Sequence, residues 1–160
     1  MKVVIEDRAE MQEILDRAQV GRLGLADENE PYVVPLNFVC SDGRIYFHTG
    51  LEGRKLDIMQ KNPRVCFEVD EILEVVINEE TTCFSTAYYK SVIAWGGVRV
   101  LDDATEKMKA LDLLMEKYAA GKKYEPIPEY ALAIVNVCEI RIEEMTGKAN
   151  LPDGGESPQT

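Results

Sequence analysis

The segment from Thr49 to Lys55 carries residue types that can hold a phosphate group. The Thr49 hydroxyl and the Lys55 cation flank Gly50 and Gly53, whose backbone N–H groups are not shielded by side chains. Two strand-like runs joined by a glycine turn precede this loop, in residues 31–49. A β-hairpin of this kind can present its backbone edges to a flat ring system. The order of hairpin, polar loop and cation therefore predicts a shelf for a cofactor with a ring and a phosphate.

The composition and charge are those of one folded domain with an acidic surface. The chain has 160 residues, of which 46% are hydrophobic and 29% charged, and its formal net charge is -11. A chain of this length can bury a core without disulfide or metal staples. The negative charge would repel a nucleic acid, and we expect no such partner. Four local cations can still bind the phosphate of a small molecule, namely Arg54, Lys55, Lys61 and Arg64.

The four cysteines predict neither disulfides nor a metal site. Each lies in an apolar run, and no two have the Cys-x-x-Cys spacing of a ligand pair; they are Cys40, Cys66, Cys83 and Cys138. We interpret them as small buried hydrophobic residues with reduced thiols. The sequence shows no signal-peptide pattern and no apolar run near the ~20 residues of a membrane span. We therefore expect a cytoplasmic protein without a membrane partner.

Three segments show the apolar spacing of amphipathic helices. Residues 7–18 and 103–121 each begin with an Asp that is followed three positions later by a Glu, which is the spacing of a capping box. A shorter helix is predicted over residues 53–63, where an Asn-Pro pair stops it. These helices are expected at the edges of the fold and in one crossover.

Seven runs rich in β-branched and aromatic residues predict strands. They span residues 20–26, 31–40, 44–49, 64–76, 81–89, 91–101 and 130–143. The pair Gly96-Gly97 suggests a β-bulge or a close backbone approach. Together these patterns predict a mainly β, α+β fold, an antiparallel barrel of six to seven strands with peripheral helices. We expect one domain over residues 1–146 and a flexible polar tail over residues 147–160.

The order of several motifs resembles the pyridoxamine 5'-phosphate oxidase-like flavin-binding split barrels, and in particular their nitroimidazole-resistance (Nim-type) branch. The similarity covers almost the whole chain, in the family's order and spacing. The motifs are GRLGLA, PYVVPLNF, IYFHTGLEGRKLD, NPRVCFEV, YYKSVIAWGGVRVLDD and EKMKALDLLMEKY. The resemblance implies a split β-barrel that forms a homodimer and binds FMN, or alternatively FAD, in a cleft between the two subunits.

The resemblance also assigns residues to the cofactor. The edge of the isoalloxazine ring would bond to the hairpin backbone at Pro35, Leu36, Asn37 and Phe38. The ribityl phosphate would be surrounded by His48, Thr49, Arg54 and Lys55. A neighbouring strand or the partner subunit would contribute Tyr89, Ser91 and Val92, with Trp95 near the cleft.

Each of these residues has a plainer alternative role. Lys55 could be a solvated surface lysine, and Arg54 could pair with Glu52 or Asp57. His48, the only histidine, could donate to the phosphate, act as a catalytic acid toward a reduced flavin, or serve the structure alone. The Asn37 amide could satisfy strand-edge backbone, and the aromatic residues at strand positions could fill the core or a dimer interface.

The activity that the resemblance implies is the flavin-dependent reduction of a small electron-poor molecule, such as a nitroimidazole or another nitroaromatic. A non-catalytic flavin-binding or storage module is one alternative. A barrel without cofactor that serves as a dimeric interaction protein is another. Oxidation of pyridoxamine phosphate is disfavoured, because the terminal segment GKANLPDGGESPQT does not resemble the C-terminal strand of that branch.

Overall fold

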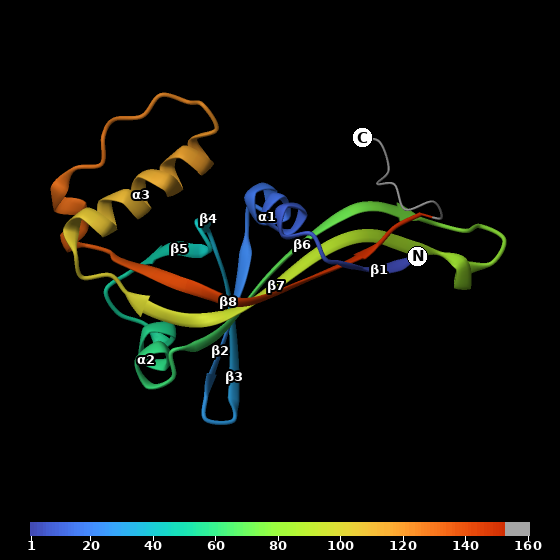
Figure 1. Cartoon of the computed structure of the whole chain (residues 1–160), viewed down its shortest axis with the longest axis horizontal. Helices are drawn as coiled ribbons and strands as arrows, with labels where there is room; N and C mark the ends of the chain where they lie inside the picture. The colour runs from blue at the N-terminus through green and yellow to red at the C-terminus, as the bar shows by residue number, and fades with distance from the viewer. Residues whose placement is uncertain (153–160) are drawn as a thin grey trace.

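Antiparallel strands dominate the computed structural model, which describes residues 1–152 (Figure 1). Within this range the strands are β1 (Lys2–Ile5), β2 (Gly21–Asp27), β3 (Glu30–Leu36), β4 (Val39–Ser41), β5 (Arg44–Thr49), β6 (Arg64–Val76), β7 (Thr86–Val100) and β8 (Asn136–Asn150). The helices are α1 (Arg8–Arg17), α2 (Arg54–Lys61) and α3 (Ala104–Ala119). The predicted α+β split-barrel fold is confirmed, with each of the three predicted helices in place.

The strands form one sheet in the order β3-β2-β6-β7-β8-β5-β4, and β1 pairs with β8. Every strand pairing within residues 1–152 is antiparallel, including β1 with β8 and β5 with β8. The strands β3 and β4 lie at the two ends of this order. One backbone edge of β3 therefore stays unpaired within the sheet, which leaves N–H and C=O groups free for another partner.

The described part of the chain has eight strands, whereas the sequence predicts six to seven. The run 31–40 divides into β3 and β4, and the runs 81–89 and 91–101 join into the single strand β7. The added strand is β1, which has only four residues and pairs with the far end of the chain. Gly96 lies at a shift of register between β7 and β8, which confirms the predicted bulge.

The expected start of a flexible tail at residue 147 is wrong, because β8 continues to Asn150 and Leu151 is buried. Gly147 pairs with Ile5 of β1, and a Cβ atom added to it would lie 2.8 Å from the Ile5 Cβ. The glycine therefore permits close packing of β8 against β1 and does not begin a tail. Residues 153–160 lie outside the described residues.

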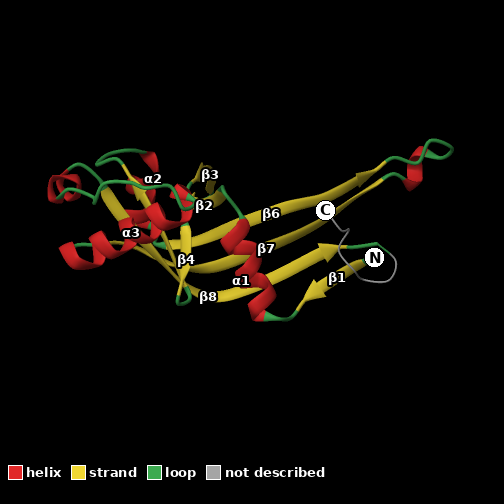
Figure 2. Cartoon of the chain, turned by 90° about the horizontal axis from the view of Figure 1, so that it is seen from above, coloured by secondary structure: helices red, strands yellow, loops and turns green. Residues whose placement is uncertain are grey.

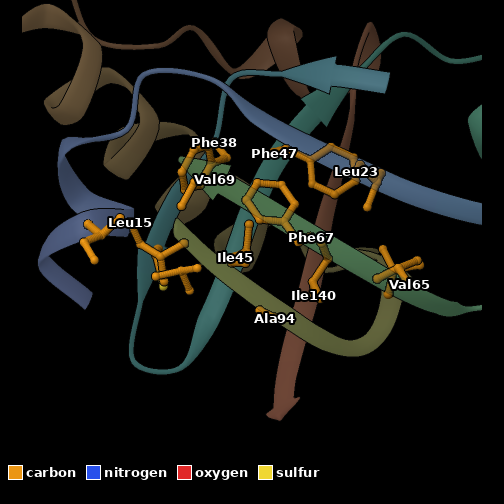
Figure 3. Packing of buried hydrophobic residues seen from close by; sticks show 14 of the residues in the cluster. Leu15, Leu23, Phe38, Ile45, Phe47, Val65, Phe67, Val69, Ala94 and Ile140 are labelled. Carbon is orange, nitrogen blue, oxygen red and sulfur yellow. The ribbon is translucent and has the colours of Figure 1, made fainter. Parts of the chain in front are cut away.

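The main core lies inside the barrel, where alternating residues of the strands meet (Figure 3). Phe38, Phe47 and Phe67 are fully buried, and the Phe38 and Phe67 rings pack edge to face with centroids 4.8 Å apart. Helix α1 contributes Ile14 and Leu15, which are buried as the apolar spacing of the helix predicts. The core thus fixes the inward faces of β2, β5 and β6.

Helix α3 packs against the outer side of the sheet and forms a second, smaller core. Its Leu111 and Leu114 are buried with Val137 of β8. The capping box predicted at its start is only half formed, because Asp103 accepts a hydrogen bond from the Glu106 N–H while the Glu106 carboxylate binds Arg99. The first turn of α3 is therefore tied to the sheet by a side chain.

The long hairpin of β6 and β7 projects beyond the barrel as an arm, shown most clearly in Figure 2. A short 3-10 turn at Thr82–Phe84 ends it. Large apolar side chains on this arm are exposed to solvent: Ile72, Val75, Ile77 and Phe84, the last with 73% of its surface exposed. Clustered exposed apolar residues are typical of a surface that another molecule covers.

Two further expectations concern the cysteines and the membrane. Cys40 and Cys138 are buried as predicted, whereas Cys66 is half-buried and Cys83 is exposed on the arm. The sequence prediction is wrong for Cys83 because this residue lies in the 3-10 turn that ends the arm, outside the barrel core. None of the helices in residues 1–152 is both long and apolar enough to cross a lipid bilayer.

Candidate functional site

The turn from β5 into α2 is the candidate phosphate-binding loop. Gly53 has a φ of 140°, a backbone conformation that residues with a side chain rarely adopt. Helix α2 begins at Arg54, and no side chain of residues 1–152 caps its N-terminus. The first N–H groups of a helix have no partner within it, and they carry the positive end of the helix dipole. The N–H groups of Arg54 and Lys55 are therefore available to a phosphate.

The end of β5 brings a hydroxyl to the same loop. Thr49 lies on the inward face of the strand together with Phe47, and only 5% of its surface is exposed. His48 points to the opposite, exposed face, as the alternation predicts. The structure therefore brings both residues to the mouth of the loop, on different sides of β5.

Asn136, at the start of β8, clamps the loop. It is the register partner of Thr49, and its side-chain amide nitrogen lies 3.3 Å from the Gly50 carbonyl oxygen and 3.4 Å from that of Leu51. Two backbone groups of the loop are thus held by one donor. The sequence gives no sign of this role, because the contact joins residues 86 positions apart.

Tyr32 of β3 connects the hairpin to the cations of α2. The Arg54 guanidinium lies over the Tyr32 ring, 4.8 Å from its centroid. Within residues 1–152 neither Arg54 nor Lys55 forms an ion pair, so the alternative pairing of Arg54 with Glu52 or Asp57 is absent there. Both cations therefore keep their charge unneutralised beside the loop.

Lys55 is half-buried and lies close enough to the barrel to affect a core thiol. Burial raises the pKa of Cys138 to about 12, and the Lys55 charge offsets part of that rise. Cys138 pairs with Phe47 in the β5–β8 ladder, two positions before Thr49. This places the Lys55 charge near the end of β5, where the phosphate is expected.

The hairpin residues expected along a ring edge divide into two groups. Pro35 and Leu36 belong to the edge strand β3, with Pro35 exposed and the Leu36 side chain turned toward the core. Asn37 follows the strand, and its amide nitrogen donates to the Gln19 carbonyl oxygen at 3.2 Å. The edge backbone at Pro35 and Leu36 therefore remains a candidate, while the Asn37 amide already has a structural partner.

Phe38 does not fit a contact with a ring. Its side chain is fully buried, and both of its backbone polar groups bind the Tyr118 hydroxyl of α3. The hydroxyl oxygen accepts from the Phe38 N–H at 2.9 Å, and its one proton is shared between the carbonyl oxygens of Phe38 at 3.0 Å and Gln19 at 2.9 Å. The groups that were expected to bond the ring are thus occupied within the chain.

The four residues expected on β7 lie on two different faces of the strand. Val92 is 1% exposed, and its backbone pairs with β6 on one side and β8 on the other, so it has nothing to offer a ligand. Tyr89, Ser91 and Trp95 alternate with it on the outward face and are half-buried. The Val92 assignment is therefore corrected to a core position, because the strand is central in the sheet.

A shallow apolar groove of about 360 Å³ includes Trp95. Its floor is a row of register partners that crosses four strands: Val33, Gly24, Cys66 and Trp95. Gly24 has no side chain at the centre of this row, so the surface is flat between Val33 and Trp95. Such a floor suits a planar ring.

The chain does not bring its two groups of candidate residues together. The α2 end of the site lies beside Val98, since Leu56 and Met59 line a small cavity with Val98. Ser91 lies seven residues earlier on the same strand, which corresponds to roughly 23 Å at the rise of an extended strand. A single ligand at Lys55 therefore cannot also touch Tyr89 or Ser91 of the same chain.

Three known proteins are similar to this chain over most of its length. A protein of Rhizobium meliloti without an assigned function is 27% identical over 158 residues, covering 93% of this chain and 96% of that protein. A proposed 5-nitroimidazole antibiotic resistance protein from Bacteroides thetaiotaomicron has a solved structure with 31% identity and a TM-score of 0.81, covering 93% of this chain and 87% of that one. A FAD-binding protein from Mesorhizobium loti shows 25% identity and a TM-score of 0.70, covering 94% and 99%.

The match extends to the family level. A family model described as pyridoxamine 5'-phosphate oxidase covers residues 7–149, which include the barrel, the three helices and the loop from Thr49 to Lys55. The chain therefore belongs to the pyridoxamine 5'-phosphate oxidase family.

Proposed function

We propose that the chain binds FMN through the loop from Thr49 to Lys55 and reduces a small electron-poor acceptor. The observation that carries this proposal is the loop itself, which within residues 1–152 combines a buried hydroxyl, two cations without an ion pair and helix N–H groups without a capping side chain. The FAD-binding relative keeps FAD as the alternative cofactor. The 31% identity to a proposed nitroimidazole resistance protein supports a nitroaromatic acceptor.

The residues present fit a flavin in both of its chemical parts. The loop fits a phosphate, and the groove between Val33 and Trp95 provides an apolar floor that fits the ring. A bound flavin supplies hydride or electron transfer. The chain would hold the phosphate with Lys55 and the loop amides, while the exposed His48 imidazole would donate to the phosphate from the outer side of β5. Trp95 would shield one side of the ring from water.

We further propose that the site is completed by a second copy of the chain. Tyr89 and Ser91 cannot reach the Lys55 loop of their own chain, whereas a partner could supply them. The arm also exposes Ile72, Val75 and Phe84, and a partner subunit would cover these side chains. A homodimer explains both observations with one interface.

Retention of FMN after desalting tests the proposed cofactor site. Protein incubated with FMN should keep the flavin absorbance bands, and Lys55→Ala should lose most of them, because the phosphate then lacks its nearest cation. Lys61→Ala is the matched control, since Lys61 lies at the other end of the same helix and pairs with Asp27. No retention of FMN or FAD by the wild-type protein would contradict the proposal.

Turnover separates a reductase from a binding module. The flavin-loaded protein should consume a reduced nicotinamide faster when a nitroaromatic acceptor is added, as followed by absorbance. Full flavin retention without any turnover would favour the non-catalytic alternative.

Light scattering tests the two-subunit site. The wild-type protein should have the mass of a dimer, and the paired change Ile72→Ser with Phe84→Ser on the arm should shift it toward the monomer and weaken flavin retention. A monomer with full flavin occupancy would contradict the shared site. The matched control is Tyr130→Ser, which also alters an exposed large side chain but lies outside the arm.

A further inference from the structure

A second cavity lies between α3 and the outer side of the sheet, away from the proposed flavin loop. Its volume is about 210 Å³. Polar and charged side chains from four elements line it: Arg44 and Tyr46 of β5, Arg99 of β7, Glu139 of β8, and Glu106 and Lys109 of α3. A volume of this size exceeds that of a few water molecules, at about 30 Å³ each.

The two carboxylates of the cavity are already neutralised. Glu139 is buried, and its two oxygens lie 3.0 Å from the Arg99 Nε and 3.3 Å from the Arg44 Nε. The Glu106 carboxylate lies 3.2 Å from an Arg99 Nη atom. Both acidic groups therefore hold the arginines in place and leave little negative charge free.

Donors remain that no carboxylate uses. In the described part of the chain Lys109 forms no ion pair, and the ion pairs of Arg44 and Arg99 leave both Nη atoms of Arg44 and one Nη atom of Arg99 without a carboxylate partner. One of the two Arg44 Nη atoms lies 3.5 Å from the Asp42 carbonyl oxygen. Three cations face two carboxylates, so the cavity has a net charge of +1 (3 − 2) in a chain of net charge -11. The Tyr46 hydroxyl is not one of these free donors: partial burial and the nearby Glu139 raise its pKa, and Glu139 accepts its hydrogen bond.

We propose that this cavity binds a small oxyanion such as inorganic phosphate. Arginine forks and a lysine ammonium are the groups that bind such an anion, and the Glu139 and Glu106 carboxylates orient the two arginines for it. The anion would bridge Lys109 of α3 to Arg44 and Arg99 of the sheet. It would thereby hold α3 on the barrel.

The proposed anion cavity is separate from the flavin loop. Arg44 and His48 lie on the same face of β5 and are four residues apart, which corresponds to roughly 13 Å. A phosphate bound at Lys55 would therefore be a different event. The two sites can be distinguished by removing one lysine at a time.

The experiment titrates inorganic phosphate into the Lys55→Ala protein at low ionic strength, by calorimetry and by the thermal midpoint. Saturable binding is expected, with a rise in the midpoint, because a ligand that binds only the folded state stabilises it. Sodium chloride at matched ionic strength should give neither saturable binding nor a rise in the thermal midpoint. Absence of saturable binding at millimolar phosphate would overturn the proposal, whatever the result for FMN.

Three further variants in the Lys55→Ala background locate the site. Lys109→Met should weaken phosphate binding by about fivefold or more, since a charge-assisted hydrogen bond is lost. Glu106→Gln should tighten it, because one negative charge leaves the cavity and an Arg99 Nη atom is released. Lys107→Met, on the same helix but outside the cavity, is the control. Equal effects of Lys109→Met and Lys107→Met would contradict the proposal.

Discussion

The Tyr118 hydroxyl contacts both backbone polar groups of Phe38: it accepts from the Phe38 N–H at 2.9 Å, and its one proton is shared between the carbonyl oxygens of Phe38 at 3.0 Å and Gln19 at 2.9 Å. Tyr118 belongs to α3, and Phe38 lies in the short connection between β3 and β4. The Tyr118 side chain therefore provides the hydrogen bonds that the backbone of Phe38 does not form with a neighbouring strand. The helix and the hairpin are joined by this contact, which crosses from the outer layer to the core.

The first prediction concerns this contact. Tyr118→Phe keeps the ring but leaves the buried N–H and C=O groups of Phe38 without a partner, so the free energy of unfolding should fall by about 1 to 3 kcal/mol. Urea denaturation measures the change. Tyr124→Phe, at an exposed position, should leave the unfolding free energy within about 0.5 kcal/mol of the wild-type value. If Tyr118→Phe lowered the unfolding free energy by no more than Tyr124→Phe does, water would have replaced the hydroxyl as the partner of Phe38.

The second prediction concerns the adjacent glycines of β7. A Cβ atom added to Gly96 would lie 1.9 Å from the Arg141 carbonyl oxygen, whereas one added to Gly97 would meet its nearest atom at 3.8 Å. Gly96→Ala must therefore displace backbone of β8, and it should cost about 3 kcal/mol or more of unfolding free energy. Gly97→Ala should cost far less. Thermal midpoints of the two variants check the difference, and equal midpoints would contradict the close approach at the bulge.

The third prediction concerns alkaline pH and the buried thiols. Burial raises the pKa of Cys40 to about 11 and that of Cys138 to about 12, from an ordinary value of 9.0. The unfolded chain loses these protons first, so their contribution to stability is complete below pH 9 and is lost as the pH rises through 11 and 12.

Urea midpoints at pH 8 and pH 10.5 measure this effect. The double variant Cys40→Ala with Cys138→Ala should lose less unfolding free energy between these pH values than the wild type, by roughly 1 to 3 kcal/mol. Cys83→Ala, at an exposed thiol, should behave like the wild type. Parallel losses in all three proteins would assign the alkaline destabilisation to other groups.

Local patterns predicted most of the fold and the centre of the candidate site. The helical spacing of residues 7–18 and the alternation of residues 44–49 depend on near neighbours, so both elements are found where they were expected. The positions of Gly50 and Gly53 also predicted a loop between Thr49 and Lys55. What the sequence could not show depends on distant contacts, such as β1 pairing with β8 and the burial of Phe38 under Tyr118.

The final prediction concerns Asn136, which no motif in the sequence singles out. Its amide nitrogen donates to the carbonyl oxygens of Gly50 and Leu51, so it sets the shape of the loop that is proposed to hold the flavin phosphate. Asn136→Ala removes the donor, and the dissociation constant for FMN should rise by about five- to tenfold, since the loop must then be ordered by the ligand itself. Quenching of the single tryptophan, Trp95, by bound FMN measures the constant.

Asn136→Asp is the sharper test of the same contact. The carboxylate has the shape of the amide but can only accept, so it would face two carbonyl oxygens and repel the phosphate as well. FMN should therefore bind Asn136→Asp more weakly than Asn136→Ala, with urea midpoints showing that both variants are folded. If the Asp variant bound FMN as tightly as the wild type, Asn136 would have no part in positioning the loop, and the phosphate site would have to be held by α2 alone.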